Sequence, residues 1–153
     1  MQAIATVAAF FRSGIKARIC TLDEVRAWAL SVIAESDQPP GEIIEVSWTK
    51  PLDAVLADLA SMEGEVDGTL VGHWLLGRVA DLPATSAEEI WDRLRQAMQI
   101  ARDADLSGLY DEFNELDDRF SLAFAGTYGE VSGCCDEFLS MLATFPKTPF
   151  SFR

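Results

Sequence analysis

Hydrophobic residues recur at intervals of three and four through most of this 153-residue chain, and this spacing places them on one side of an α-helix. The segment 21–36, TLDEVRAWALSVIAES, is the clearest case. It begins with Thr21, and Glu24 follows three residues later, which is typical of a capping box at a helix start. Ser86 and Glu89 form a second such pair. No segment shows a convincing strand pattern, so the sequence predicts an all-α fold of six to seven helices.

One segment differs from these amphipathic helices. Residues 69–82, TLVGHWLLGRVADL, are apolar on nearly every side, which is typical of a central, buried helix that is too short to cross a membrane. We expect a single compact domain around it, at residues 21–145. Residues 1–20 are predicted to be an N-terminal arm or a loosely packed helix, and residues 146–153 an extended tail.

The charge of the chain restricts its partners. There are 25 acidic and 12 basic residues, for a net charge of −13, although the first 20 residues hold three bases and no acid. Such a chain repels the phosphates of nucleic acids and anionic lipid headgroups. We therefore expect no nucleic-acid partner and no membrane partner. A basic protein partner remains, and so does the simpler interpretation that the charge only maintains solubility.

The cysteines indicate a compartment. Cys20, Cys134 and Cys135 are odd in number and show no CxxC spacing, so they do not form a disulfide framework. A reducing cytoplasm fits them best. Cys134 and Cys135 also lie at core spacing from Val131 and Phe138, where a free cysteine behaves as a small hydrophobic residue.

The densest group of acids lies in LYDEFNELDDRF, residues 109–120. At 100° per residue, the apolar side chains of this segment fall on one side of a helix and most of its acids on the opposite side. One interpretation is a solvated face. The other is a docking surface for a basic partner, since residues 103–118 contain seven acids and no base. The candidate partner-binding residues are Asp103, Asp105, Asp111, Glu112, Glu115 and Asp118.

The motifs of common enzymes do not occur. The chain has no GxGxxG, P-loop, HExxH or GxSxG motif and no zinc-ligand spacing, so we expect no catalytic residues, no cofactor and no metal site. His73 is the only histidine. It lies within the apolar segment 69–82, where it is either a core histidine or the titratable residue of a pocket.

Residues 19–48, ICTLDEVRAWALSVIAESDQPPGEIIEVSW, resemble the opening of small helical bacterial proteins, many of which are similar to the immunity partners of secreted toxins. A Thr-capped helix with a Trp-Ala pair is followed there by a proline turn and a short Ile-Ile-Glu-x-Ser segment. The matching positions here are Thr21, Trp28, Ala29, Pro39, Pro40, Ile43, Ile44, Glu45 and Ser47. The resemblance implies a non-enzymatic protein with an acidic face for a basic toxin domain.

Three hypotheses follow. The first is a protein-binding module of the immunity type that docks a basic partner through the acids of residues 103–118. The second is a small enzyme or ligand-binding protein with a pocket around His73. The third is a structural subunit of a helical assembly. The sequence does not determine the oligomeric state.

Overall fold

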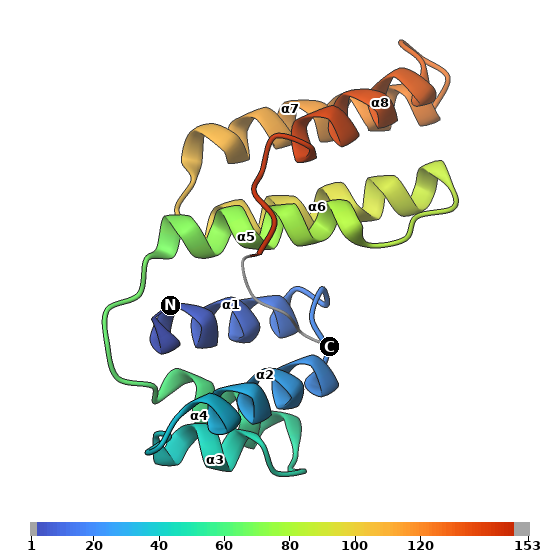
Figure 1. Cartoon of the computed structure of the whole chain (residues 1–153). Coiled ribbons are helices and arrows are strands. Elements are labelled where there is room, and N and C mark those ends of the chain that lie inside the picture. The colour runs from blue at the N-terminus through green and yellow to red at the C-terminus, as the bar shows by residue number, and fades with distance from the viewer. Residues whose placement is uncertain (1–2, 149–153) are drawn as a thin grey trace. The chain divides into compact units, whose positions relative to one another are not determined.

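A computed structural model describes residues 3–148 and shows eight α-helices within them (Figure 1). The all-α prediction is confirmed. The helices are α1 (Ile4–Lys16), α2 (Leu22–Glu35), α3 (Gly41–Val46), α4 (Leu52–Ala60), α5 (Gly68–Asp81), α6 (Ala87–Asp103), α7 (Ser107–Phe124) and α8 (Val131–Leu142). The count exceeds the prediction because both the N-terminal segment and the six-residue α3 are helical.

The packing groups these helices into two compact units. Residues 3–71 belong to unit 1, which holds α1 to α4, and residues 72–148 belong to unit 2, which holds α6 to α8 and most of α5. The periodicity of the sequence does not predict this division, because it reports which side of a helix is apolar and not which helices pack together.

Unit 1 is built around α1. This helix packs against α4, while α3 packs against both α2 and α4. Phe10 and Phe11 of α1 are fully buried, and the Phe11 ring lies 5.3 Å from the ring of Trp28 in α2. The expectation of an arm or a loosely packed helix at residues 1–20 is therefore corrected for α1. Its apolar side chains form part of the core of the unit.

A threonine fixes the loop that follows α4. Thr6 is the one buried polar residue of the described part of the chain. Its hydroxyl donates to the carbonyl of Glu65 at 3.5 Å and accepts from the backbone N–H of Asp67 at 3.3 Å. The Thr6 hydroxyl thus provides a hydrogen-bond partner for one carbonyl and one N–H of the loop backbone beside α1.

Unit 2 is held together by aromatic contacts. In it, α6 packs against α7 and α8, and α7 packs against α8. The Trp91 ring of α6 stacks on Phe124 of α7 with centroids 4.9 Å apart. Phe113 of α7 meets Phe138 of α8 edge to face at 5.9 Å. Such pairs add about 0.5–1.5 kcal/mol to the stabilisation from burial alone.

Helix α5 is buried as predicted, since Val71, Trp74, Leu75, Leu76 and Val79 are all at most 5% exposed. The segment after α8, drawn in red in Figure 1, contacts α5 at three points. Phe145 lies against His73, the carbonyl of Pro146 lies over Gly77, and Lys147 pairs with Asp81. Residues 149–153 of the predicted tail lie outside the described residues, while residues 146–148 are not helical.

The helix starts follow the sequence signals closely. The capping box of Thr21 and Glu24 is complete, with hydrogen bonds of 2.9 and 3.2 Å in the two directions. At α6, Ser86 accepts from the backbone N–H of Glu89 at 3.2 Å, but the Glu89 carboxylate accepts from Thr85 instead of from Ser86. The second predicted box is therefore only half formed.

The close approach at Gly77 yields a stability prediction. A Cβ at this position would lie 2.1 Å from the carbonyl oxygen of Pro146, so Gly77→Ala forces the segment after α8 away from α5. We expect a loss of about 1–3 kcal/mol in the free energy of unfolding, as for other overpacked sites. Urea denaturation followed by circular dichroism measures it.

Gly133 in α8 is the matched control. A Cβ there meets nothing within 4 Å, so Gly133→Ala should stabilise the protein by about 0.5–1 kcal/mol through helix propensity alone. If both substitutions changed stability in the same direction, the packing of Pro146 on Gly77 would not be a stabilising contact.

Candidate functional site

The six acids singled out in the sequence are all exposed. Asp111, Glu115 and Asp118 follow one another on α7 at spacings of four and three residues, which places them on one side of the helix. We call these three residues the acidic stripe. The opposite side of α7 is buried through Phe113, Leu116 and Phe120. The placement of the acids in solvent is thus as the sequence predicts.

Asp103 and Asp105 lie where α6 ends and α7 begins. Asp105 has a φ of 57°, in the left-handed region. The N–H of Leu106 donates to the carbonyl of Ala101 at 2.8 Å, and the N–H of Asp105 donates to Arg102 at 3.2 Å. These bonds form a Schellman motif, in which glycine is the usual residue at the position of Asp105. An aspartate there carries a conformational cost of about 1 kcal/mol or more.

None of the six acids forms an ion pair within residues 3–148, although Asp103 and Glu115 lie close enough to Arg102 and Arg119 to raise the pKa of each arginine. The side chains of Asp103, Asp105, Asp111, Glu112, Glu115 and Asp118 take part in no ion pair there. Other carboxylates of the chain are paired, including Asp58 with Lys50 and Glu137 with Arg119. These carboxylates therefore give one side of α7 and the α6–α7 junction a negative charge that no ion pair within the described residues neutralises.

Asp117 is different from its acidic neighbours. It is half-buried, and its carboxylate accepts a hydrogen bond of 2.6 Å from Nε1 of Trp91 in α6. The guanidinium of Arg95 stacks over the Trp91 ring at 4.4 Å and its Nε lies 4.0 Å from Asp117. The sequence places Asp117 at the edge of the apolar side of α7, but it does not identify Trp91 as the partner. Asp117 thus ties α7 to α6.

Arg119 pairs with another helix. The sequence predicts an ion pair with Glu115 one turn earlier, whereas the guanidinium of Arg119 donates to both oxygens of Glu137 in α8, at 2.6 and 2.8 Å. The prediction is corrected, because a bidentate carboxylate offers a better geometry than a pair along one helix. The hydrogen bonds from Arg119 lower the pKa of Glu137. Glu115 forms no ion pair within the described residues, although its charge still contributes to the raised pKa of Arg119.

Two exposed apolar residues lie beyond the acidic stripe, and the sequence did not identify them as part of a site. Leu122 is four residues after Asp118 on the same side of α7 and is 42% exposed. Tyr128, in the loop before α8, is 75% exposed, and its N–H lies 3.4 Å from the carbonyl of Leu122. Helical spacing could have predicted that Leu122 lies on the same side of α7 as the acidic stripe. The position of Tyr128 could not be predicted in this way, because it depends on the turn between α7 and α8.

A base also lies near the acids. Arg102, at the end of α6, donates to the hydroxyl of Tyr110 at 2.9 Å, and its guanidinium lies 5.2 Å from the ring centre. Arg102 lies just before residues 103–118, the range in which the sequence contains no base. Because the Tyr110 side chain holds the guanidinium, the positive charge of Arg102 lies at the α6–α7 junction. It does not lie on the side of α7 that carries the acidic stripe.

His73, the residue of the alternative pocket, is half-buried on α5. Its ring centre lies 5.6 Å from that of Phe145. The segment after α8 therefore covers part of the histidine. The neighbouring Gly72 is also closely packed, because a Cβ there would lie 2.8 Å from the Cβ of Ala104. The pocket around His73 stays a prediction.

Cys134 and Cys135 are both buried in α8, and both are free, while Cys20 is also buried. Burial raises the pKa of Cys135, and the neighbouring Cys134 and Asp136 add to this effect. A raised pKa leaves little thiolate at neutral pH, and thiolate is the reactive form. The arrangement matches the core packing expected from their spacing.

Among residues 3–148, no group of three or more His, Cys, Asp or Glu side chains is arranged to hold a metal ion. No helix in that range is both long enough and apolar enough to cross a membrane. No protein-family model matches the chain, and no curated protein or solved structure matches it.

The ion pair between α7 and α8 predicts a dependence of stability on pH. The pKa of Glu137 is lowered in the folded state, so its contribution is present above the unfolded pKa and is lost as the pH falls through the folded pKa. At pH 7 we expect Arg119→Gln to cost about 0.5–1 kcal/mol of unfolding free energy, because the pair is partly exposed. Below about pH 4 this difference should shrink.

Lys16→Gln is the control for this experiment, since it removes one positive charge from an exposed side chain at the end of α1. Urea denaturation between pH 3 and 7 measures both variants. A cost of Arg119→Gln that stayed constant across this range would show that the contact does not act through the Glu137 charge.

Proposed function

We propose that this protein is a non-enzymatic protein-binding module that docks a basic partner through α7. The binding surface consists of the acidic stripe with Glu112 beside it, and of Asp103 and Asp105 at the α6–α7 junction. The proposal includes the immunity type of function that the resemblance of residues 19–48 implies, with a basic toxin domain as the partner.

The observation that carries this proposal is that none of the six acids forms an ion pair within residues 3–148. Acids of one charge at helical spacing repel each other, which costs about 0.2–0.5 kcal/mol per adjacent pair. Asp111 and Glu115 form such a pair on α7. A cationic partner removes this cost on binding. Before contact, the same field accelerates the encounter and selects partners of opposite charge.

The apolar residues beside the stripe refine the chemistry of the partner. Leu122 is exposed one turn after Asp118, and Tyr128 is exposed in the loop whose backbone meets the Leu122 carbonyl. Tyrosine is common among residues that dominate binding energy. The partner that fits this surface carries several lysines or arginines along one face, followed by an apolar side chain that contacts Tyr128.

A cytoplasmic location belongs to the same proposal. Its support is the free state of the adjacent Cys134 and Cys135, since cysteines without a disulfide are typical of reducing compartments. An immunity protein of this kind would meet its toxin inside the cell that it protects.

Charge reversal of the acidic stripe tests the docking surface. We expect the variant Asp111→Lys, Glu115→Lys, Asp118→Lys to lose a partner that the unmodified protein captures from a lysate of the source organism at low salt. Because the interaction is electrostatic, about 0.5 M salt should also release that partner, since the Debye length then falls to a few Å. Quantitative mass spectrometry of the bound fraction measures both effects.

The matched control reverses Glu35, Asp37 and Glu63, three exposed acids of unit 1. This variant has the same net charge as the first, so it should keep the partner. Loss of the partner from both variants would mean that total charge, and not the acidic stripe, is responsible. Retention of the partner by the stripe variant, with an unchanged response to salt, would refute the proposal.

The substitution Asp105→Gly separates the effect of residue 105 on partner binding from its effect on stability. Glycine adopts the left-handed conformation of residue 105 without strain, so the free energy of unfolding should rise by about 0.5–1 kcal/mol. The same substitution removes one acid of the binding surface, so affinity for the captured partner should fall, though less than in the triple variant. A rise in stability with unchanged affinity would exclude Asp105 from the surface.

A further inference from the structure

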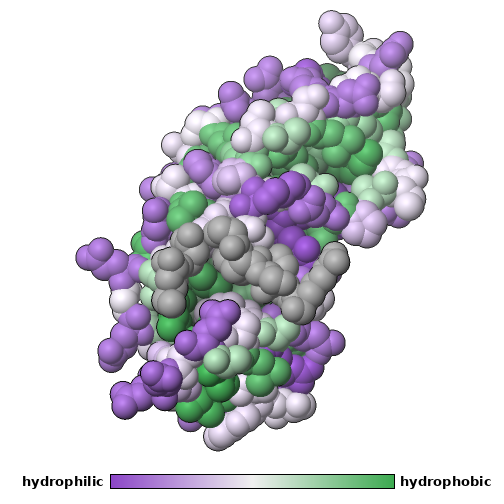
Figure 2. Space-filling model, viewed as in Figure 1, coloured by the Kyte–Doolittle hydropathy of each residue, from purple (hydrophilic) through white to green (hydrophobic). Residues whose placement is uncertain are grey.

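The turn between α3 and α4 in unit 1 exposes three large apolar side chains. Trp48 is 58% exposed, Leu52 45% and Ile44 36%. They follow one another at four-residue spacing through α3, the turn after it and the first residue of α4. We call them the Trp48 patch. Figure 2 shows hydrophobic residues at the surface of this end of unit 1. Trp48 differs in this from Trp28 and Trp74, which are both buried.

The turn that displays Trp48 is held firmly. The N–H of Trp48 donates to the carbonyl of Glu45 at 3.1 Å. The next residue, Thr49, accepts a hydrogen bond of 3.0 Å from the guanidinium of Arg26 in α2. A tryptophan on a turn held by these bonds loses little backbone entropy when a partner binds, which favours its use as an anchor.

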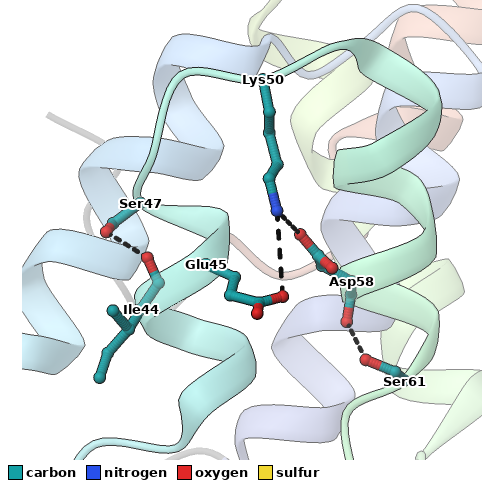
Figure 3. A network of polar contacts seen from close by, with 6 residues as sticks. All are labelled: Ile44, Glu45, Ser47, Lys50, Asp58 and Ser61. Carbon is teal, nitrogen blue, oxygen red and sulfur yellow. Dashed lines mark hydrogen bonds and ion pairs between the residues drawn. The ribbon is translucent and has the colours of Figure 1, made fainter.

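Lys50 fixes the turn from the other side. Its ammonium lies 2.6 Å from Asp58 of α4 and 3.9 Å from Glu45 of α3, as Figure 3 shows. In the same view, Ile44 points away from this network. The Lys50 ammonium is also 6.0 Å from the centre of the Trp48 ring. The lysine charge is thus compensated by two carboxylates beside the Trp48 patch.

The charges around the patch identify its occupant. Between Arg26 and Arg78 the chain holds nine acids and a single base, which is Lys50. Asp53 of α4 is exposed next to Leu52, and the Glu45 side chain is 52% exposed. The two bases beside the patch are both compensated, since Arg26 pairs with Asp23, and Lys50 pairs with Asp58 and Glu45. Asp53 forms no ion pair within residues 3–148, so an apolar group that approaches Trp48 meets a net negative charge. A second copy of this chain would bring the same negative surroundings, which opposes self-association.

We propose that the Trp48 patch is a docking site for a partner segment that combines apolar side chains with lysines or arginines, such as one face of a basic amphipathic helix. The apolar side chains contact Ile44, Trp48 and Leu52, while the cations of the segment lie near Glu45 and Asp53. This site is in unit 1 and is independent of the acidic stripe in unit 2.

The test uses the full chain with the acidic stripe already reversed at Asp111, Glu115 and Asp118, so that unit 2 does not compete for the probe. The probe is a synthetic helical peptide of leucine and lysine. Two matched peptides replace its lysines by glutamates or its leucines by serines. Titration is followed by NMR of the tryptophan indole N–H groups, and the Trp48 signal is identified by its loss in Trp48→Ala.

We expect the leucine–lysine peptide to shift the Trp48 indole signal and both matched peptides to bind at least about tenfold more weakly. Trp48→Ala should weaken binding of the leucine–lysine peptide at least about tenfold, and Leu52→Ala should weaken it less, since truncation of an aromatic anchor has the larger effect. Leu139→Ala in α8 removes a side chain of equal exposure, 45%, and should leave binding unchanged.

Three results would overturn the proposal: equal binding of the leucine–glutamate peptide, equal binding by Trp48→Ala, or no binding by the parent protein. A dimer in sedimentation experiments that Trp48→Ala dissociates would assign the patch to a second copy instead. Because every variant here lacks the acidic stripe, failure at the Trp48 patch leaves the proposed function of unit 2 untouched, and the lysate experiment tests that function separately.

Discussion

The burial of one side of α7 against α6 and α8 determines the chemistry of the surface of unit 2. Phe113, Leu116 and Phe120 are fully buried, and the fixed rotation of 100° per residue then leaves Asp111, Glu115 and Asp118 no position except in solvent. An 18-residue helix with so many like charges would be unstable alone. The packing of its apolar side therefore stabilises a charge arrangement that the helix by itself would oppose.

Aromatic and ionic contacts fix this arrangement from both sides. Trp91 of α6 binds Asp117 and stacks on Phe124, while Glu137 of α8 binds Arg119 in a bidentate pair. These contacts satisfy the charged side chains at the edges of the buried side of α7. The acids on the opposite, exposed side of the helix form no ion pair within the described residues. The protein thus separates the charges that hold helices together from the charges that remain available to a partner.

The two candidate surfaces differ in physical character. The acidic stripe offers charge over most of its length, with Leu122 and Tyr128 at one end, whereas the Trp48 patch offers apolar area with acids at its border. Long-range charge chiefly accelerates encounter, while a rigid tryptophan chiefly slows dissociation. Both surfaces favour cationic partners, which agrees with the net charge of −13.

The sequence by itself determined most of the helices and their buried sides, because both depend on local spacing and on capping signals such as Thr21 with Glu24. It also placed the acids of α7 in solvent. Only the tertiary structure decided which charges are paired. Arg119 forms its ion pair with Glu137 of another helix and not with Glu115 of its own. Trp91 donates a hydrogen bond to Asp117, which lies 26 residues away in the sequence. The exposure of Trp48 likewise depends on a six-residue helix and a turn held by Arg26 and Lys50. Contacts between distant residues depend on how the helices pack, and periodicity within a helix carries no information about that packing.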